Sequence, residues 1–268
     1  MRSLGWLLVC FLSIQYAYSA GSGKKGVALN PSGYHCNDIN AFTNIHWWYD
    51  WAETPWYHTN NHCHVNQRSG RVPMVWGWRR NIDYPMHLPH DSNTVLLFNE
   101  PNFRAQANLP AAEAARIWKN EIQPKLGGKT LVGPAAALCG SKAQCYDNSY
   151  EWFTEFFQHC SGCKVDYIAT HAYFCNADQT MDMLQRLWNM FHKPIWLTEF
   201  ACPQSNSVDQ QLNYMKQVLP RLEAAHYVAK YAWFTTRTHG DGWITSAASL
   251  LDQHSSTLTT LGNYYNNF

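Results

Sequence analysis

Two glutamates occupy matching positions in this sequence, each at the end of an apolar run. Glu100 follows the run Thr94–Asn99 and precedes Pro101, and Glu199 follows the apolar residues 195–197. Apolar runs without alternation are typical of strands that are buried on both faces in a parallel sheet. A carboxylate at the C-terminal end of such a strand points to the edge where α/β folds carry out their chemistry.

A pair of carboxyl groups is the minimum chemical equipment for glycoside hydrolysis. One carboxyl group must be protonated to act as an acid, and the other must be ionised. In a retaining enzyme the two groups lie about 5–5.5 Å apart. Either glutamate alone could be a salt-bridged or solvated residue at a strand end. The matching contexts of Glu100 and Glu199 favour a catalytic pair.

Three further polar residues near predicted strand ends are candidates for binding sugar. Asn99 is adjacent to Glu100 and can hydrogen-bond a sugar hydroxyl near the reacting carbon. His171 and Tyr173 alternate along one apolar segment, so both side chains lie on the same side of that strand. If this side faces the interior of a barrel, both residues line the site. If it faces the helices, His171 is a histidine of the core.

Eight segments have the apolar, β-branched or aromatic character of strands. They are Gly26–Asn30, Ile45–Trp51, Arg71–Trp78, Thr94–Asn99, Thr130–Ala136, Val165–Phe174, Pro194–Phe200 and Lys230–Thr235. Segments with helical periodicity follow most of the strands from the fourth onward. They are Pro110–Leu126, Tyr150–Phe157, Asp178–Phe191, Val208–Ala225 and Leu258–Tyr265. This alternation predicts an α/β fold consisting of one (β/α)8 TIM barrel, with weak helical signals after the first three strands.

The sequence contains 13 tryptophans, and its aromatic content is 15%. Such a composition suits either a well-packed core or a cleft whose indole rings stack on sugars. Five tryptophans lie at or near predicted strand ends, and two of them are Trp48 and Trp76. We select the other three as candidate sugar-binding residues. These three are Trp78, Trp233 and Trp47, and core packing is the alternative for each.

The N-terminus has the three parts of a secretory signal peptide. Arg2 provides a positive start, an apolar run extends from Leu4 to Ile14, and small residues follow. The apolar run is too short to span a bilayer. Cleavage after Ser19 makes residues 1–19 the signal peptide and residues 20–268 a single catalytic domain. We expect a secreted, extracellular protein without a membrane partner.

Eight of the nine cysteines follow the predicted signal peptide, which contains Cys10. An even number of cysteines in an oxidising compartment predicts disulfide bonds. Cys175 and Cys202 follow neighbouring predicted strands, whose spacing of about 4.8 Å suits a disulfide. Proximity in the sequence suggests the remaining pairs, which are Cys139–Cys145, Cys160–Cys163 and Cys36–Cys63.

The overall charge argues against partners that bind by electrostatic attraction alone. The formal net charge is +1, and charged residues make up 15% of the sequence. A nucleic-acid partner is therefore not expected. His62 and His64 flank Cys63, but the paired ligand spacing of a zinc site is missing, and a disulfide is the preferred use of Cys63. We predict no metal site, no cofactor and a monomeric protein.

Several motifs resemble the clan A retaining glycosidases and, in detail, the endo-β-1,3-glucanases of glycoside hydrolase family 128. The matching pieces extend over nearly all of the chain after the predicted signal peptide. They are Leu97–Asn102, Val132–Ala135, Thr170–Tyr173, Pro194–Ala201 and Leu258–Gly262. The segment between Cys36 and Cys63 has no clear counterpart. The resemblance implies that Glu100 is the general acid/base and that Glu199 is the nucleophile.

The sequence therefore predicts a secreted retaining glycoside hydrolase that cleaves β-1,3-glucan internally. Its partner would be the polysaccharide substrate. A secreted polysaccharide-binding or cell-wall protein on the same barrel, without turnover, is the alternative. The presence of both Glu100 and Glu199 favours the enzyme.

Overall fold

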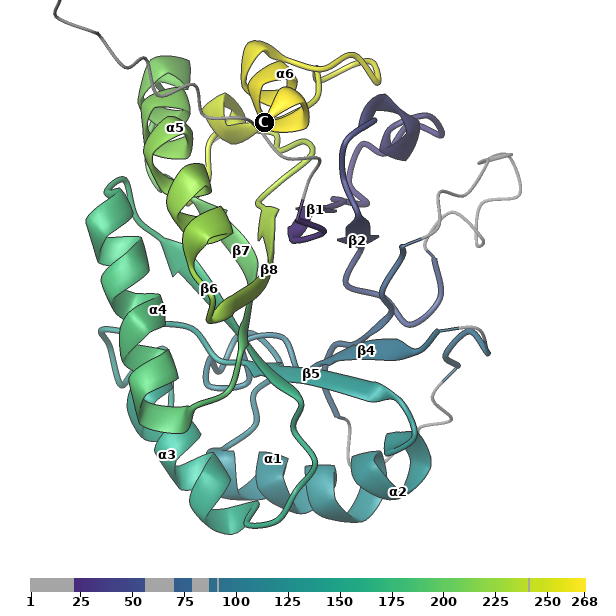
Figure 1. Ribbon diagram of the computed structural model, residues 1–268, viewed down its shortest axis with the longest axis vertical. Helices are drawn as coiled ribbons and strands as arrows, with labels where there is room; N and C mark the ends of the chain where they lie inside the picture. The colour runs from purple at the N-terminus through teal and green to yellow at the C-terminus, as the bar shows by residue number, and fades with distance from the viewer. Residues whose placement is uncertain (1–21, 56–69, 79–86, 91, 241) are drawn as a thin grey trace, which may run out of the picture.

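The computed structural model describes residues 22–55, 70–78, 87–90, 92–240 and 242–268 (Figure 1). The predicted signal peptide and Cys63 lie outside these residues. Eight parallel strands form one sheet in the order β2-β1-β8-β7-β6-β5-β4-β3. The strands are β1 Lys25–Ala28, β2 Trp47–Tyr49, β3 Met74–Val75, β4 Thr94–Leu97, β5 Thr130–Ala135, β6 Tyr167–Tyr173, β7 Ile195–Ala201 and β8 Val228–Trp233.

The two end strands of the sheet, β2 and β3, are joined through the residues that precede β3. Trp48 of β2 forms a parallel bridge with Arg71. The backbone N–H of Trp48 donates to the carbonyl of Gly70 at 3.0 Å, and that of Val72 donates to the carbonyl of Trp48 at 2.9 Å. The sheet thus closes on itself, which confirms the predicted (β/α)8 barrel.

Helices cover the outside of the barrel along β4 to β8. In Figure 1, α4 and α5 lie beside β6, β7 and β8, and α1 and α2 lie below β4 and β5. The helices are α1 Ala111–Ile117, α2 Gln123–Leu126, α3 Ser149–His159, α4 Ala177–Phe191, α5 Val208–Ala224 and α6 Thr260–Asn267. Between β2 and β4, the described residues form no helix, which agrees with the weak helical signals there.

The predicted helix Pro110–Leu126 is interrupted. A π-helical turn, Trp118–Ile122, separates α1 from α2. Pro124 lies at the start of α2 and has no backbone N–H to donate to the preceding turn. A wider turn at this point is a regular response of a helix to such a missing hydrogen bond.

Two apolar layers stabilise the barrel. The larger layer lies between the strands and the helices and includes Val95, Leu97, Phe153 and Leu219. The smaller layer fills the interior of the barrel. It consists of Ala28, Trp47, Tyr49, Val72, Met74, Leu96, Val132, Ala135, Ala169, Trp196 and Ala232. Because side chains alternate along each strand, successive residues belong to different layers.

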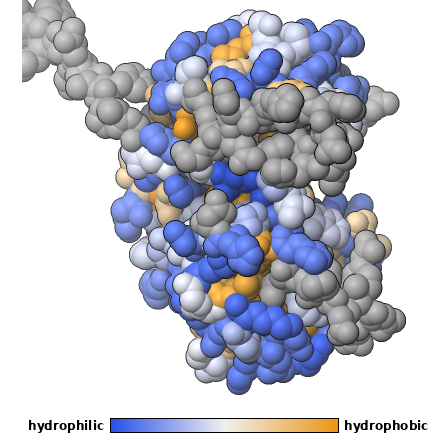
Figure 2. Space-filling model, turned by 90° about the vertical axis from the view of Figure 1, so that its right-hand side faces the viewer, coloured by the Kyte–Doolittle hydropathy of each residue, from blue (hydrophilic) through white to orange (hydrophobic). Residues whose placement is uncertain are grey.

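Three disulfide bonds join cysteines within the described residues. They are Cys139–Cys145, Cys160–Cys163 and Cys175–Cys202. The predicted Cys36–Cys63 pair involves a residue that lies outside the described part of the chain. On the face shown in Figure 2 hydrophilic residues predominate around limited apolar patches. Among the described helices, none is both long and apolar enough to cross a bilayer.

Candidate active site

A cleft of about 1040 Å³ opens at the C-terminal ends of the strands. Glu100 follows β4, His171 and Tyr173 lie at the C-terminal end of β6, and Glu199 lies in β7. All four residues line this cleft together with Asn99. The structure therefore brings together five of the residues that the sequence singled out, and it places His171 and Tyr173 on the interior side of the barrel.

The two glutamates meet at the imidazole of His171. Nδ1 of His171 lies 2.8 Å from Oε1 of Glu100 and 3.3 Å from Oε2 of Glu199. One carboxylate oxygen from each glutamate and the histidine nitrogen all lie within 4.8 Å of one another. This closeness is compatible with a retaining glycosidase, whose two carboxyl groups lie about 5–5.5 Å apart.

Glu199 is held by donors from two other strands. Nε1 of Trp51, just after β2, donates to Oε1 at 2.8 Å, and the hydroxyl of Tyr173 donates to Oε2. The hydroxyl of Tyr49 lies 3.4 Å from Oε1 and donates to the carbonyl of Thr198 at 3.0 Å. The carboxylate is thus fixed in orientation, and its side chain is only 6% exposed.

Opposing influences act on the protonation of these groups. Burial raises the pKa of Glu199, and the nearby charge of Glu100 adds to this shift. The charge of His171 and the hydrogen bonds from Tyr173 and Trp51 oppose it. Burial also raises the pKa of Tyr173 and of Tyr49 well above the usual value, so both hydroxyls stay protonated and can donate.

Among the described residues that contact Glu100 or Glu199, only His171 can carry a positive charge, which it does when its ring is protonated. Burial lowers the pKa of His171, but the carboxylates of Glu199 and Glu100 raise it, and the net shift is upward. Nε2 of His171 and Oδ1 of Asn99 are buried and have no hydrogen-bond partner among the described residues.

The backbone at Glu100 takes an uncommon conformation. Its φ angle is 41°, in the left-handed region that residues with a side chain rarely adopt. The backbone N–H of Glu100 donates to the carbonyl of Ala135 at 3.1 Å. This sharp bend at the end of β4 allows Asn99 and Glu100 to both line the cleft, although they are consecutive in the chain.

The three tryptophans selected from the sequence as sugar-binding residues do not line the cleft. Trp47 is buried inside the barrel, where it packs on Trp196 with ring centroids 4.8 Å apart. Trp233 is fully buried against the helices and donates to the carbonyl of Ala248. Trp78 packs against the outer apolar layer. The burial of Trp47 and Trp233 favours their alternative interpretation as packing residues, and a role of Trp78 in binding sugar stays a prediction.

Other aromatic residues line the cleft instead. They are Trp51, Trp76, Phe103, Phe174, Phe234 and Trp243. Trp51 lies four residues after Trp47 on the same side of its segment, and Phe234 lies next to Trp233 on the opposite side. The signal that could have identified them is strand alternation combined with distance from the strand end.

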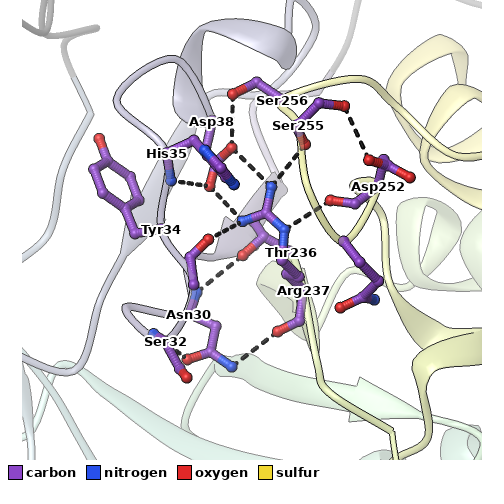
Figure 3. Close-up of polar contacts among 12 residues, drawn as sticks. Asn30, Ser32, Tyr34, His35, Asp38, Thr236, Arg237, Asp252, Ser255 and Ser256 are labelled. Carbon is purple, nitrogen blue, oxygen red and sulfur yellow. Dashed lines mark hydrogen bonds and ion pairs between the residues drawn. The ribbon is translucent and has the colours of Figure 1, made fainter.

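The segment after β8 contributes Phe234, Thr238 and Trp243 to the cleft. Arg237 of the same segment fixes this segment to the loop after β1. In Figure 3 the guanidinium of Arg237 faces Asp38, which lies in the loop after β1. Two hydrogen bonds of 2.7 and 3.0 Å join them, and neither side chain has any exposed surface. The other N–H groups of the guanidinium donate to the carbonyls of Gly33, Asp252 and Ser255.

One group of described residues has the donor atoms to hold a metal ion, namely Glu100, His171 and Glu199. The same three side chains already form the contacts of His171 with Glu100 and Glu199 described above. His62 and His64, the candidate metal ligands near Cys63, lie outside the described residues.

The barrel and its carboxylate pair define a glycoside hydrolase of the TIM-barrel class. The family model described as "Glycosyl hydrolase catalytic core" matches residues 26–265. The chain is 35% identical to a solved endo-β-1,3-glucanase of glycoside hydrolase family 128, subgroup II, from Sorangium cellulosum, with 91% of this chain and 97% of that one covered and a TM-score of 0.75. The chain therefore belongs to glycoside hydrolase family 128.

Two further relatives extend the comparison. A subgroup II endo-β-1,3-glucanase from Pseudomonas viridiflava is 29% identical, with 91% of this chain and 97% of that one covered and a TM-score of 0.72. Alkali-sensitive linkage protein 1 of Schizosaccharomyces pombe is 29% identical over 265 residues, which cover 92% of this chain. The chain spans only 45% of the length of this curated relative.

Proposed function

We propose that the chain is a retaining endo-β-1,3-glucanase that uses Glu100 as general acid/base and Glu199 as nucleophile. The observation that carries the proposal is the spacing of one oxygen from each carboxylate, within 4.8 Å across the cleft. The substrate class is supported by the endo-β-1,3-glucanases of subgroup II, to which the chain is similar over most of its length.

The surroundings of the two glutamates support these separate roles. A nucleophile must be ionised, and Glu199 accepts hydrogen bonds from Trp51 and Tyr173, which favour its charged form. Glu100 contacts His171 and its side chain is more exposed, at 15% against 6% for Glu199. This exposure suits a group that must reach first the leaving oxygen and then a water molecule.

The reaction follows from this arrangement in two displacements. Glu199 attacks the anomeric carbon while Glu100 protonates the departing glycosidic oxygen, so a glycosyl-enzyme forms and the leaving chain departs as an alcohol. Glu100, now ionised, removes a proton from water, and the oxygen of this water displaces Glu199. The two inversions give net retention at the anomeric carbon.

We further propose that the protein acts outside the cell. Support comes from the disulfide bonds, which persist in oxidising compartments, and from the expected signal peptide at residues 1–19. Mass spectrometry of the N-terminus of the secreted protein tests this proposal. A mature protein that begins at Ala20 is the expected result, and a retained Met1 contradicts it.

The two glutamates can be distinguished with an aryl β-glucoside that carries a good leaving group and with added azide. In Glu199→Ala, azide replaces the carboxylate as the nucleophile and gives an α-glycosyl azide. In Glu100→Ala, the first step still proceeds because this leaving group needs no proton, and azide attacks the glycosyl-enzyme to give a β-glycosyl azide. Proton NMR of the products distinguishes the two anomers.

The control is Glu113→Ala, which changes a glutamate on the outer helix α1 and should keep wild-type activity. Products of the opposite configuration would reverse the roles of Glu100 and Glu199. Wild-type activity in both variants would place the site elsewhere. A reducing-sugar assay on soluble β-1,3-glucan tests the alternative function, because binding without new reducing ends supports a non-catalytic wall protein.

A further inference from the structure

Asn102, two residues after Glu100, is fully buried beside the cleft and does not line it. Its side-chain amide bonds to both ends of one loop, residues 137–147. Nδ2 donates to the carbonyls of Ala137 at 2.8 Å and Asp147 at 3.1 Å. Oδ1 accepts from the backbone N–H of Ala137 at 3.2 Å. One side chain therefore holds the two ends of this loop together.

The loop that Asn102 holds forms the cleft wall next to Glu100. Leu138, Gly140 and Gln144 line the cleft, and the disulfide Cys139–Cys145 closes the loop. Two backbone hydrogen bonds join the loop to the segment that carries Glu100. The N–H of Tyr146 donates to the carbonyl of Asn102 at 2.9 Å, and the N–H of Arg104 donates to the carbonyl of Gln144 at 2.9 Å.

Glu100 needs such external support because its backbone conformation is unfavourable. A residue with a side chain in the left-handed region persists there when the surrounding contacts over-determine its position. The backbone N–H of Glu100 is bound to the carbonyl of Ala135, just before the loop that Asn102 holds. The loop, Asn102 and the bend at Glu100 therefore form one hydrogen-bonded unit.

We propose that Asn102 is a positioning residue that aims the carboxyl group of Glu100 at the glycosidic oxygen. It acts through the backbone of Glu100 and through the cleft wall at residues 137–147, and it touches neither the substrate nor Glu199. The inference rests on the proposed function, in which Glu100 supplies the proton. Its consequence for the first step is specific, because a misplaced acid lowers kcat/KM, which reports formation of the glycosyl-enzyme, only where the leaving group needs a proton.

The test compares two aryl β-glycosides of a β-1,3-linked gluco-oligosaccharide in the same preparation of each variant. The 2,4-dinitrophenolate of the first glycoside departs without a proton. The phenolate of the unsubstituted phenyl glycoside needs a proton to depart. For Asn102→Ala we expect kcat/KM on the phenyl glycoside to fall by roughly 10–100-fold, while kcat/KM on the dinitrophenyl glycoside stays close to that of the wild type. The ratio of the two values does not depend on the fraction of folded enzyme.

A second variant keeps the volume of the side chain. Asn102→Asp retains an acceptor for the N–H of Ala137 but loses the amide donor that serves two carbonyl oxygens. We expect the same selective loss on the phenyl glycoside. The matched control is Asn266→Ala, because Asn266 is a buried asparagine whose side chain bonds to Thr43 and Asn44 near the start of β2, at the other end of the barrel.

Asn266→Ala should lower stability and leave the ratio between the two substrates unchanged. If Asn102→Ala and Asn102→Asp slow both glycosides by the same factor, Asn102 has only a structural role and the inference is wrong. If the wild-type enzyme cleaves neither glycoside, the proposed function fails and the inference is overturned with it. A selective loss in the Asn102 variants alone supports the positioning role.

Discussion

Asp38 and Arg237 form an ion pair in which neither side chain has exposed surface. Asp38→Asn keeps the shape of the side chain but removes its charge, so the guanidinium of Arg237 stays buried without a counter-charge. Asp38 also accepts hydrogen bonds from the backbone N–H of His35 at 3.0 Å and from the hydroxyl of Ser256 at 2.8 Å (Figure 3). Removing one partner from a buried pair costs about 3–5 kcal/mol of unfolding free energy.

Thermal and urea unfolding measure this cost. For a barrel of this size, about 3–5 kcal/mol corresponds to a decrease in Tm of roughly 6–20 °C. The control is Asp178→Asn, because Asp178 pairs with Arg221 at 2.6 Å but its side chain is 76% exposed. An exposed pair contributes about 0–1 kcal/mol. If the two variants lose the same small amount of stability, burial does not set the strength of the Asp38–Arg237 pair.

Two further predictions concern the cleft. Because the proposed nucleophile Glu199 must be ionised and burial raises its pKa, kcat/KM should fall as the pH decreases through that raised pKa. Tyr173→Phe removes a donor that lowers this pKa, so the acidic limb should move to higher pH, and an unmoved or lowered limb contradicts this assignment. Trp76→Ala should lower kcat/KM on soluble β-1,3-glucan by roughly 10–100-fold, since Trp76 lines the cleft. Trp78→Ala should lower stability without this loss, and equal kinetic effects would refute the distinction.

The strands could be predicted because their apolar character is local. Every predicted strand overlaps an observed one, and the two glutamates stand at or near the predicted strand ends. The interruption of the helix Pro110–Leu126 was not predicted, although Pro124 was visible in the sequence. A proline marks a missing donor, but the tertiary packing decides whether the helix ends, bends or forms a π-helical turn there.

The tryptophans show where the sequence was insufficient. Trp47, Tyr49 and Trp51 all face the barrel interior, but only Trp51 reaches the cleft. Trp233 and Phe234 are adjacent, and the smaller ring is the one that lines the cleft. The sequence establishes which residues share a side of a strand, but the face that points inward and the height within the barrel depend on register. Residue type alone therefore selected Trp47 and Trp233, which are buried, instead of Trp51 and Phe234, which line the cleft.

The environment of Glu199 illustrates the same dependence on register. Its donors Trp51 and Tyr173 come from the ends of the segments of β2 and β6, which are distant in the chain but converge on one carboxylate. Burial alone would favour the protonated carboxyl, which cannot act as a nucleophile. The indole N–H and the phenol O–H, together with the charge of His171, oppose that effect. The barrel therefore supplies both the burial of Glu199 and the donors that favour its ionised carboxylate, which the proposed role as nucleophile requires.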